Sequence, residues 1–225
     1  MGKKTSSGPS VASSRIAAWL AFAGASVFLG LLAVLHFLEP EFNPGWRMIS
    51  EYELGSYGWM MQLAFFCMGL YCLATVIALR PHVTTTFGRF GLVLLAVAGI
   101  IGAGAGVFKT DPITAPATAA TAFSLLHSFC GLVFIVGFPI AVTLIRRSLA
   151  LNEAWAPKRR WLLWVTVLVW VGGLGFIASG IVFSQGKNGF GPKVLIGWPN
   201  RFMVAIYSAW ILMVTWFTMR FVSKN

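Results

Sequence analysis

The stretch IAAWLAFAGASVFLGLLAVLHFL, residues 16–38, decides the class of fold, because it is a long apolar run without a charged side chain. A helix of roughly 20 apolar residues crosses the ~30 Å hydrocarbon core of a bilayer. The run is too long for the core of a signal peptide, and no small-residue cleavage site ends it, so we expect it to be retained. Its residues are apolar on every face, which excludes a spanning strand.

Five further runs of the same kind follow, and their number predicts the architecture. The chain of 225 residues is 58% hydrophobic and only 10% charged, with a mean hydropathy of +0.80. We therefore predict an all-α integral membrane protein, a single bundle of six transmembrane helices within residues 16–222. Residues 1–15 are polar and are expected to form a disordered cytoplasmic tail. The predicted spans are residues 16–38, 59–79, 90–108, 123–145, 161–183 and 202–221.

The basic residues predict the orientation. The formal net charge is +11, and 12 of the 17 Lys and Arg residues lie at the two termini and in the loops at 80–89 and 146–160. Cytoplasmic loops carry an excess of Lys and Arg, so both termini are predicted to be cytoplasmic, with the protein in the inner (plasma) membrane. Short loops between apolar runs do not form the basic face that nucleic-acid binding needs, so we expect no nucleic-acid partner.

The first external loop is unusually acidic. Residues 39–59, EPEFNPGWRMISEYELGSYGW, contain four of the six acidic residues of the chain. Pro44 and Gly45 interrupt the chain, and the segment after them predicts a short interfacial helix. Its aromatic residues suit the headgroup layer of a membrane. They are Trp46, Tyr52, Tyr57 and Trp59.

Small residues predict where helices pack closely. The third run contains Gly102 and Gly106 at G-x-x-x-G spacing, and the fifth contains a series of glycines from Gly172 to Gly180. Such spacing lets helix backbones approach each other in lipid. We expect both helices to be tightly packed.

Polar residues gather at one predicted depth, the external ends of the helices. Ionisable groups at the edge of the hydrocarbon are costly and indicate a functional site. We predict an outward-facing polar pocket that binds a lipid headgroup or a small polar ligand. Arg201 would hold an anionic group, and Asp111 would orient His127. The predicted ligand-binding residues are Glu51, Asp111, His127 and Arg201, supported by Ser50, Tyr52, Lys109, Asn200 and His36.

Catalytic and metal chemistry have weaker support. Only His36 and His127 lie in the runs, too few for a membrane zinc hydrolase and too shallow for a paired haem site. Ser124 and His127 share a helix face at i, i+3 spacing, but serine is common in such helices for packing. Cys67, Cys72 and Cys130 fall inside apolar runs and predict no disulfide. We therefore predict no metal or cofactor and assign no catalytic residue.

Four motifs carry a resemblance to a known family. They are NPGWRMISEYELGSYGW at 43–59, GVFKTDP at 106–112, LLHSFCG at 125–131 and GWPNR at 197–201. In this order they resemble the bacterial six-helix membrane family catalogued as domain of unknown function 998. The resemblance implies recurring positions at Ser50, Glu51, Gly55, Gly58, Trp59, Asp111, Pro112, His127 and Arg201. It implies no reaction.

Two alternatives to the ligand pocket are open from the sequence. The protein could be a structural or assembly subunit whose outer polar residues only pair with each other, for example Glu51 with Arg201 or Asp111 with His127. It could also be a small transporter, although the interior of the runs offers few polar residues for a water-filled path. Membrane lipids are the expected partners, and the oligomeric state is not predicted.

Overall fold

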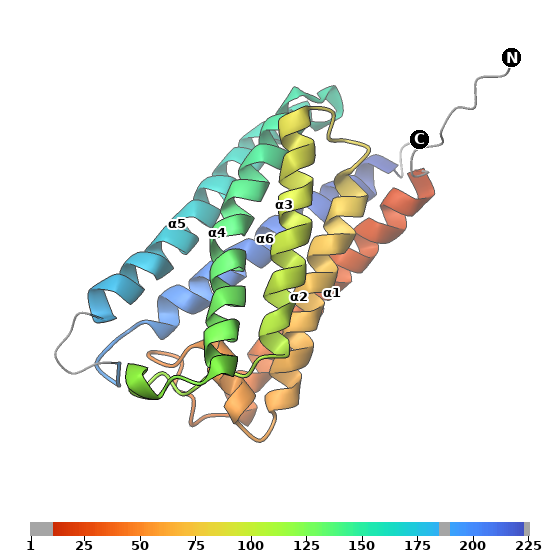
Figure 1. The fold of residues 1–225 in the computed structure, drawn as a ribbon. Coiled ribbons are helices and arrows are strands. Elements are labelled where there is room, and N and C mark those ends of the chain that lie inside the picture. The colour runs from red at the N-terminus through yellow and green to blue at the C-terminus, as the bar shows by residue number, and fades with distance from the viewer. Residues whose placement is uncertain (1–10, 185–189, 223–225) are drawn as a thin grey trace, which may run out of the picture.

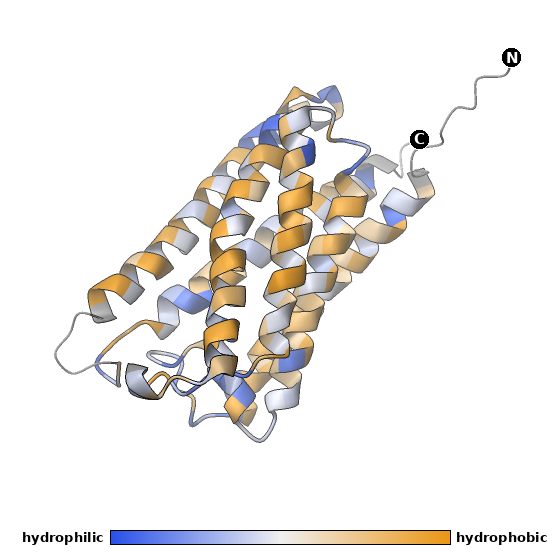
Figure 2. Ribbon diagram, viewed as in Figure 1, coloured by the Kyte–Doolittle hydropathy of each residue, from blue (hydrophilic) through white to orange (hydrophobic). Residues whose placement is uncertain are grey.

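Six long helices, one for each apolar run, make up most of the described chain, which comprises residues 11–184 and 190–222 of a computed structural model (Figure 1). All six are long and apolar enough to cross a membrane. Hydrophilic residues gather at the two ends of the bundle (Figure 2). The protein is therefore a multi-pass, all-α membrane protein, as predicted. The helices are α1 (Val11–Leu38), α2 (Gly58–Leu79), α3 (Thr86–Ala103), α4 (Ala122–Leu151), α5 (Arg159–Ser184) and α6 (Gly197–Val222).

Several helix ends differ from the predicted ones. Helix α1 begins at Val11, so residues 11–15 are helical, and residues 1–10 of the expected tail lie outside the described chain. Helix α3 begins at Thr86, where the side chain of Thr85 caps it by accepting a hydrogen bond from the N–H of Gly88. Helix α6 begins at Gly197 and tolerates Pro199 in its first turn, where the N–H has no helical partner.

The six helices form a ring. Helix α1 packs against α2 and α6, α3 against α2 and α4, and α5 against α4 and α6. Near the middle of α4 and α6, aromatic side chains pack in the centre of the ring. The rings of Phe138 and Tyr207 stack at a centroid distance of 4.5 Å, and the Tyr207 hydroxyl donates to the carbonyl of Ile135 at 2.9 Å. Both side chains are fully buried.

Glycines bring α3 close to its neighbours. A Cβ added at Gly102 would lie 2.9 Å from Met68 and 3.0 Å from Phe134, and one at Gly106 would lie 2.9 Å from the backbone of Gln62. The prediction of tight packing is confirmed for α3. It is wrong for part of α5, because a Cβ at Gly175 or Gly180 would meet nothing within 4 Å.

Both ends of the described chain lie at one end of the bundle, and the opposite end carries three loops (Figure 1). We call this opposite end the distal end. Its first loop folds into the short helix η1 (Ile49–Leu54), where a short helix was predicted. Tyr52 is fully buried in the bundle, so its predicted place among the headgroups is wrong, whereas Tyr57 and Trp59 are exposed. The loop is thus packed onto the helix ends.

The other connections include three more short 3-10 helices. Helix η2 (Gly104–Gly106) continues the glycine-rich end of α3, and η3 (Ala117–Ala119) lies in the second distal loop. Helix η4 (Glu153–Lys158) connects α4 to α5 at the end of the bundle near the termini, where it buries Trp155.

Candidate functional site

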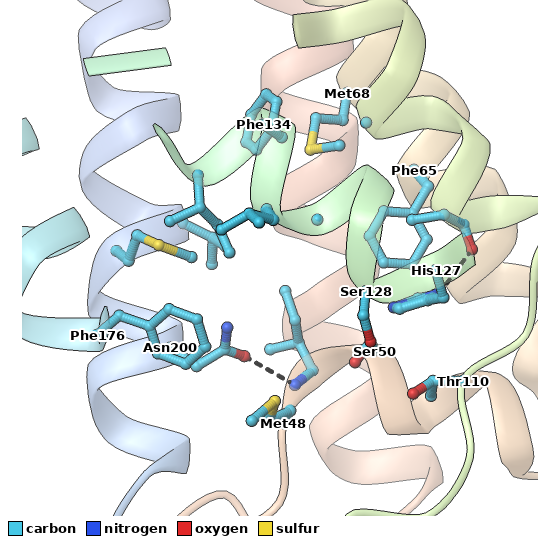
Figure 3. A pocket seen from close by; sticks show the side chains of 18 of the residues that line it. Met48, Ser50, Phe65, Met68, Thr110, His127, Ser128, Phe134, Phe176 and Asn200 are labelled. Atoms are coloured by element: carbon cyan, nitrogen blue, oxygen red, sulfur yellow. Dashed lines mark hydrogen bonds between the residues drawn. The ribbon is translucent and has the colours of Figure 1, made fainter. Parts of the chain in front are cut away.

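A cavity of about 320 Å³ lies inside the ring toward its distal end, and residues of all six helices line it (Figure 3). We call it the chamber. Most of its lining is Phe, Met, Ile, Leu, Val, Ala and Gly. The polar side chains belong to distal loops or to the distal turns of α4 and α6, so one end of the chamber is polar and the rest is apolar. These polar side chains are Ser50, Thr110, His127, Ser128 and Asn200.

His127 is fixed by backbone carbonyls. Its Nδ1 lies 2.7 Å from the carbonyl oxygen of Phe108 and 3.1 Å from that of Ala105, both in the connection that follows α3. A carbonyl only accepts, so Nδ1 carries the proton, and in the neutral ring Nε2 is an acceptor. The ring is 8% exposed and lines the chamber. His127 therefore offers the chamber a fixed hydrogen-bond acceptor.

Asp111, the predicted partner of His127, bonds to a different residue. Asp111 accepts hydrogen bonds from the N–H of Thr121 at 2.8 Å and from its hydroxyl at 3.1 Å. These bonds lower the pKa of Asp111 and fix the start of α4, because Thr121 is the N-cap residue of that helix. The prediction that Asp111 orients His127 is wrong. The groups that orient His127 are backbone carbonyls, and a pattern of side chains in the sequence gives no information about such contacts.

Asn200 ties the first loop to α6. Its Oδ1 accepts a hydrogen bond from the N–H of Ile49 at 2.9 Å, and the side chain is buried. The oxygen turns toward Ile49 and the amide nitrogen turns away from it (Figure 3). Asn200 lines the chamber, so its N–H groups are donors at the polar end.

The chamber opens sideways between α4 and α5. The two helices are joined toward the termini, where Trp170 donates to the hydroxyl of Thr143 at 2.8 Å and a Cβ at Gly173 would lie 3.5 Å from Pro139. Farther toward the distal end they separate. A Cβ at Gly131, which lines the chamber, would meet nothing within 4 Å, and the neighbouring Leu132 is 57% exposed. Because Leu132 lines the chamber, is exposed and belongs to a membrane span, we infer that the chamber opens here toward the hydrocarbon region.

A second cavity of about 210 Å³ adjoins the polar end of the chamber. The two cavities share Met48, Ser50, Thr110 and Ser128, and both Glu51 and Asp111 line the second one. We call it the side cavity. It connects the polar end of the chamber to the second distal loop.

Glu51 pairs with Arg47 and not with Arg201. Its Oε1 lies 3.0 Å from the guanidinium of Arg47, four residues earlier in the same loop. Its two oxygens also accept hydrogen bonds from the N–H groups of Met48 at 2.9 Å and Ile113 at 2.8 Å. Glu51 thus joins the first and second distal loops, and the suggested pair with Arg201 is wrong.

Arg201 holds the first loop against α1. Its Nε donates to Nε2 of His36 at 2.8 Å, and its two terminal nitrogens donate to the Arg47 carbonyl at 2.7 Å and the Tyr52 hydroxyl at 3.1 Å. A guanidinium can donate in several directions at once, which suits this role. Arg201, His36 and Tyr52 are not among the residues that line the chamber or the side cavity. We call these three residues with Arg47 the distal latch.

Two buried carboxylates were not among the predicted site residues. Glu53 is 2% exposed, and neither of its oxygens makes a hydrogen bond of ordinary geometry with the described chain. One oxygen lies 3.6 Å from Nδ1 of His127. Burial raises the pKa of Glu53 to about 8, against the opposing effects of the Thr110 N–H and the charge of Lys109. Glu53 is therefore mostly protonated at neutral pH.

Glu39 is buried in a similar way. It is 1% exposed, and it accepts a hydrogen bond from the N–H of Tyr57. Burial raises its pKa, and Glu41 adds to the rise. A side chain at Gly55 would overlap the Glu39 carboxylate, which would have to move to make room for it. The sequence does not indicate whether an acidic residue in a loop is buried. The burial of Glu39 and Glu53 could therefore be seen only in the structure.

The nine predicted site residues thus fall into separate groups. Ser50, His127 and Asn200 line the chamber, while Glu51 and Asp111 line the side cavity with Ser50. Tyr52, His36 and Arg201 belong to the distal latch, and Lys109 is exposed. In residues 11–184 and 190–222, no three His, Cys, Asp or Glu side chains converge as metal ligands.

A comparison with protein families gives one match. A family model with the description "Protein of unknown function (DUF998)" covers residues 18–217. No curated protein and no solved structure matches the chain.

Proposed function

Since the chain belongs to the DUF998 family, whose description assigns no reaction, we propose its function from its own site: it binds an amphiphilic ligand taken from the membrane. The apolar part of the ligand occupies the chamber, and its polar end meets Ser50, His127 and Asn200. The distal end faces the outside of the plasma membrane, in line with the excess of Lys and Arg at the other end.

One observation carries this proposal. The chamber is apolar over most of its lining, polar only near the distal loops, and open between α4 and α5 toward the hydrocarbon region. Its volume of about 320 Å³ is at the lower end of the usual range for ligand sites, roughly 300–1,000 Å³. An amphiphile matches this division into a polar and an apolar part. A small water-soluble ligand would leave the apolar walls without a partner.

The charged residues support a second candidate function, that of a structural or assembly subunit. Glu51 pairs with Arg47, and Arg201 donates to His36 and Tyr52, so these charges are already satisfied within the chain. In our proposal they hold the loops in place and the neutral residues bind the ligand. The transporter alternative is disfavoured, because the stacked and fully buried rings of Phe138 and Tyr207 occupy the middle of the bundle.

A pair of glycine substitutions tests the proposal. Gly131 lines the chamber and Gly30 on α1 does not, yet a Cβ at either position would meet nothing within 4 Å. Native mass spectrometry of gently solubilised protein is expected to detect a bound lipid in wild type and in Gly30→Phe, and to detect its loss in Gly131→Phe, where the new ring fills the chamber. Circular dichroism and size-exclusion chromatography check that both variants fold.

Two results would overturn the proposal. One is equal lipid retention by folded Gly131→Phe and Gly30→Phe, which would locate the lipid outside the chamber. The other is wild-type protein with no specifically retained lipid, which would favour the structural subunit.

A further inference from the structure

We propose that the chamber selects a lipid with an uncharged, hydroxyl-bearing head, such as an acylglycerol, and rejects lipids with a phosphate head. This inference rests on the proposed function and narrows the class of ligand. It follows from the charges and hydrogen-bonding groups at the polar end of the chamber.

The described part of the chamber lining contains no cationic side chain. Its polar members are three hydroxyl residues, a histidine and an asparagine. Two cations near the polar end are occupied, because Arg201 donates to His36, Tyr52 and backbone carbonyls and Arg47 pairs with Glu51. A third, Lys109, precedes the chamber-lining Thr110 but is itself exposed and not part of the lining. A phosphate buried without a cation would lose its hydration and gain no charged partner. The expectation that Arg201 holds an anionic group therefore has no support from the geometry.

Acidic groups near the chamber also disfavour the binding of a phosphate head. One oxygen of Glu53 lies 3.6 Å from the ring of His127, and Glu51 and Asp111 line the adjoining side cavity. Glu53 is mostly protonated and Glu51 is paired with Arg47, so the negative charge that repels a phosphate head belongs to Asp111, whose pKa is lowered by its hydrogen bonds from Thr121. An uncharged head avoids this repulsion.

The hydrogen-bonding groups favour hydroxyls. His127 offers an acceptor at Nε2, because Nδ1 donates to the carbonyl of Phe108. Asn200 offers donors, because its Oδ1 is already bonded to the N–H of Ile49. Ser50, Thr110 and Ser128 add hydroxyls that can donate or accept. A head with more than one hydroxyl can satisfy both kinds of group at once, whereas a phosphate or a carboxylate only accepts.

The opening between α4 and α5 suits a lipid with a long chain. The helices are joined at Thr143–Trp170 and separate toward Gly131, which lies at the level of the hydrocarbon region. The chain of a bound lipid can leave the chamber there without crossing the polar loops. A neutral head can also pass through the opening from the bilayer at lower cost than a charged one.

Three probes with the same oleoyl chain test the inference on the full-length protein. They are 1-oleoylglycerol, its 3-phosphate, and methyl oleate, which has no hydroxyl. Saturable binding is measured by native mass spectrometry over a range of probe concentrations in one detergent. We expect 1-oleoylglycerol to bind at least about ten-fold more tightly than either of the others, since each net hydrogen bond is worth about 1 kcal/mol and a buried unpaired phosphate costs more.

Two substitutions refine the test. Asn200→Asp keeps an acceptor for the N–H of Ile49 but removes the amide donors, and it is expected to weaken 1-oleoylglycerol binding about five-fold or more. Ser128→Lys places a cation at the exposed edge shared by both cavities, and it is expected to raise the affinity for the phosphate probe relative to 1-oleoylglycerol.

The outcomes separate the inference from the proposed function. If wild type binds the phosphate probe or methyl oleate as tightly as 1-oleoylglycerol, and Gly131→Phe still blocks that binding, the chamber binds lipid but the selectivity is wrong. If none of the probes binds saturably and no native lipid is retained, the proposed function is wrong as well. A ten-fold preference that is lost in Gly131→Phe supports both.

Discussion

Arg201 shows how a single residue can be located correctly and paired incorrectly. Its position near the distal end follows from the predicted span, yet its partners are a histidine ring, a phenol and two backbone carbonyls. The opposite charge of Glu51 suggested it as the partner of Arg201, but Glu51 forms an ion pair with Arg47, which is close to it in the sequence. Arg47 and Glu51 are four residues apart in the same loop, so their pair needs no distant segment.

Glu53 predicts a pH dependence of stability. Its pKa is about 8 in the folded protein and near the ordinary value of 4.5 in the unfolded chain. The raised pKa therefore gives a contribution to the free energy of unfolding that is fully present below pH 4.5. This contribution is lost as the pH rises through 8. The apparent Tm of wild type in detergent should fall by about five degrees or more between pH 5 and pH 9. Glu53→Gln, which cannot ionise, should show a flatter profile.

The control for this measurement is Glu153→Gln, because Glu153 is exposed and lies in η4, at the other end of the bundle. It should retain the wild-type profile. Glu39, whose pKa is also raised by burial, contributes with the same sign and accounts for the slope left in Glu53→Gln. A Glu53→Gln profile as steep as that of wild type would mean that Glu53 is ionised in the folded protein, contrary to its unpartnered burial.

At the scale of elements, the first distal loop covers the distal ends of the helices. Helix η1 buries Ile49, Glu51, Tyr52 and Glu53, and the distal latch and Asn200 attach it to α1 and α6. Met48, Ile49 and Ser50 of this loop line the chamber. The polar end of the chamber therefore depends on how firmly the loop is held.

Arg201→Lys tests the distal latch. Lysine keeps the charge but lacks the planar set of donors that reach His36, Tyr52 and the Arg47 carbonyl. Hydrogen–deuterium exchange of the peptide covering residues 46–57 should become about ten-fold faster or more, because the loop opens locally at a lower free energy. Exchange in α2 and α3 should change little.

Arg89→Lys, an exposed position at the other end of the bundle, is the matched control and should leave the exchange of residues 46–57 unchanged. Wild-type protection of this segment in Arg201→Lys would show that the latch does not hold the loop. Asn200 and the Glu51 contacts would then be the attachments that matter.

At the scale of the whole molecule, the described cavities lie toward one end of the bundle. The rings of Phe138 and Tyr207 stack in its middle and are fully buried. The distal half contains the chamber, the side cavity and the buried carboxylates. The orientation of the bundle therefore determines which compartment the polar end of the chamber faces.

Cysteine labelling tests the orientation. Ser56 is exposed in the first distal loop, and Thr84 is exposed at the end near the termini. In intact cells, a membrane-impermeant maleimide is expected to label Ser56→Cys and to label Thr84→Cys only after permeabilisation, because the end rich in Lys and Arg stays in the cytoplasm. Wild type, with Cys67, Cys72 and Cys130 all inside helices, gives the background. The reverse labelling pattern would invert the protein and place the chamber's polar end toward the cytoplasm.

The number of helices and the membrane class follow from the sequence by itself, because crossing a bilayer requires about 20 consecutive apolar residues, a property of local sequence. The predicted helix ends were less accurate, because α3 and α6 begin before their apolar runs. Helix α3 begins after its N-cap residue, Thr85, and α6 includes Pro199 in its first turn. The distal location of His127 and Asn200 also follows from the spans, since each lies near the start of its apolar run.

The chamber and its hydrogen bonds were decided only by the tertiary structure. Arg201 meets His36 across 165 positions of sequence, Asn200 meets Ile49 across 151, and the carbonyl that fixes His127 belongs to another segment. Side-chain chemistry alone allows many such pairs, and backbone carbonyls and empty volume leave no mark in a residue pattern. Which pairs form depends on how the six helices pack around one another, and that packing left the distal half of the ring hollow.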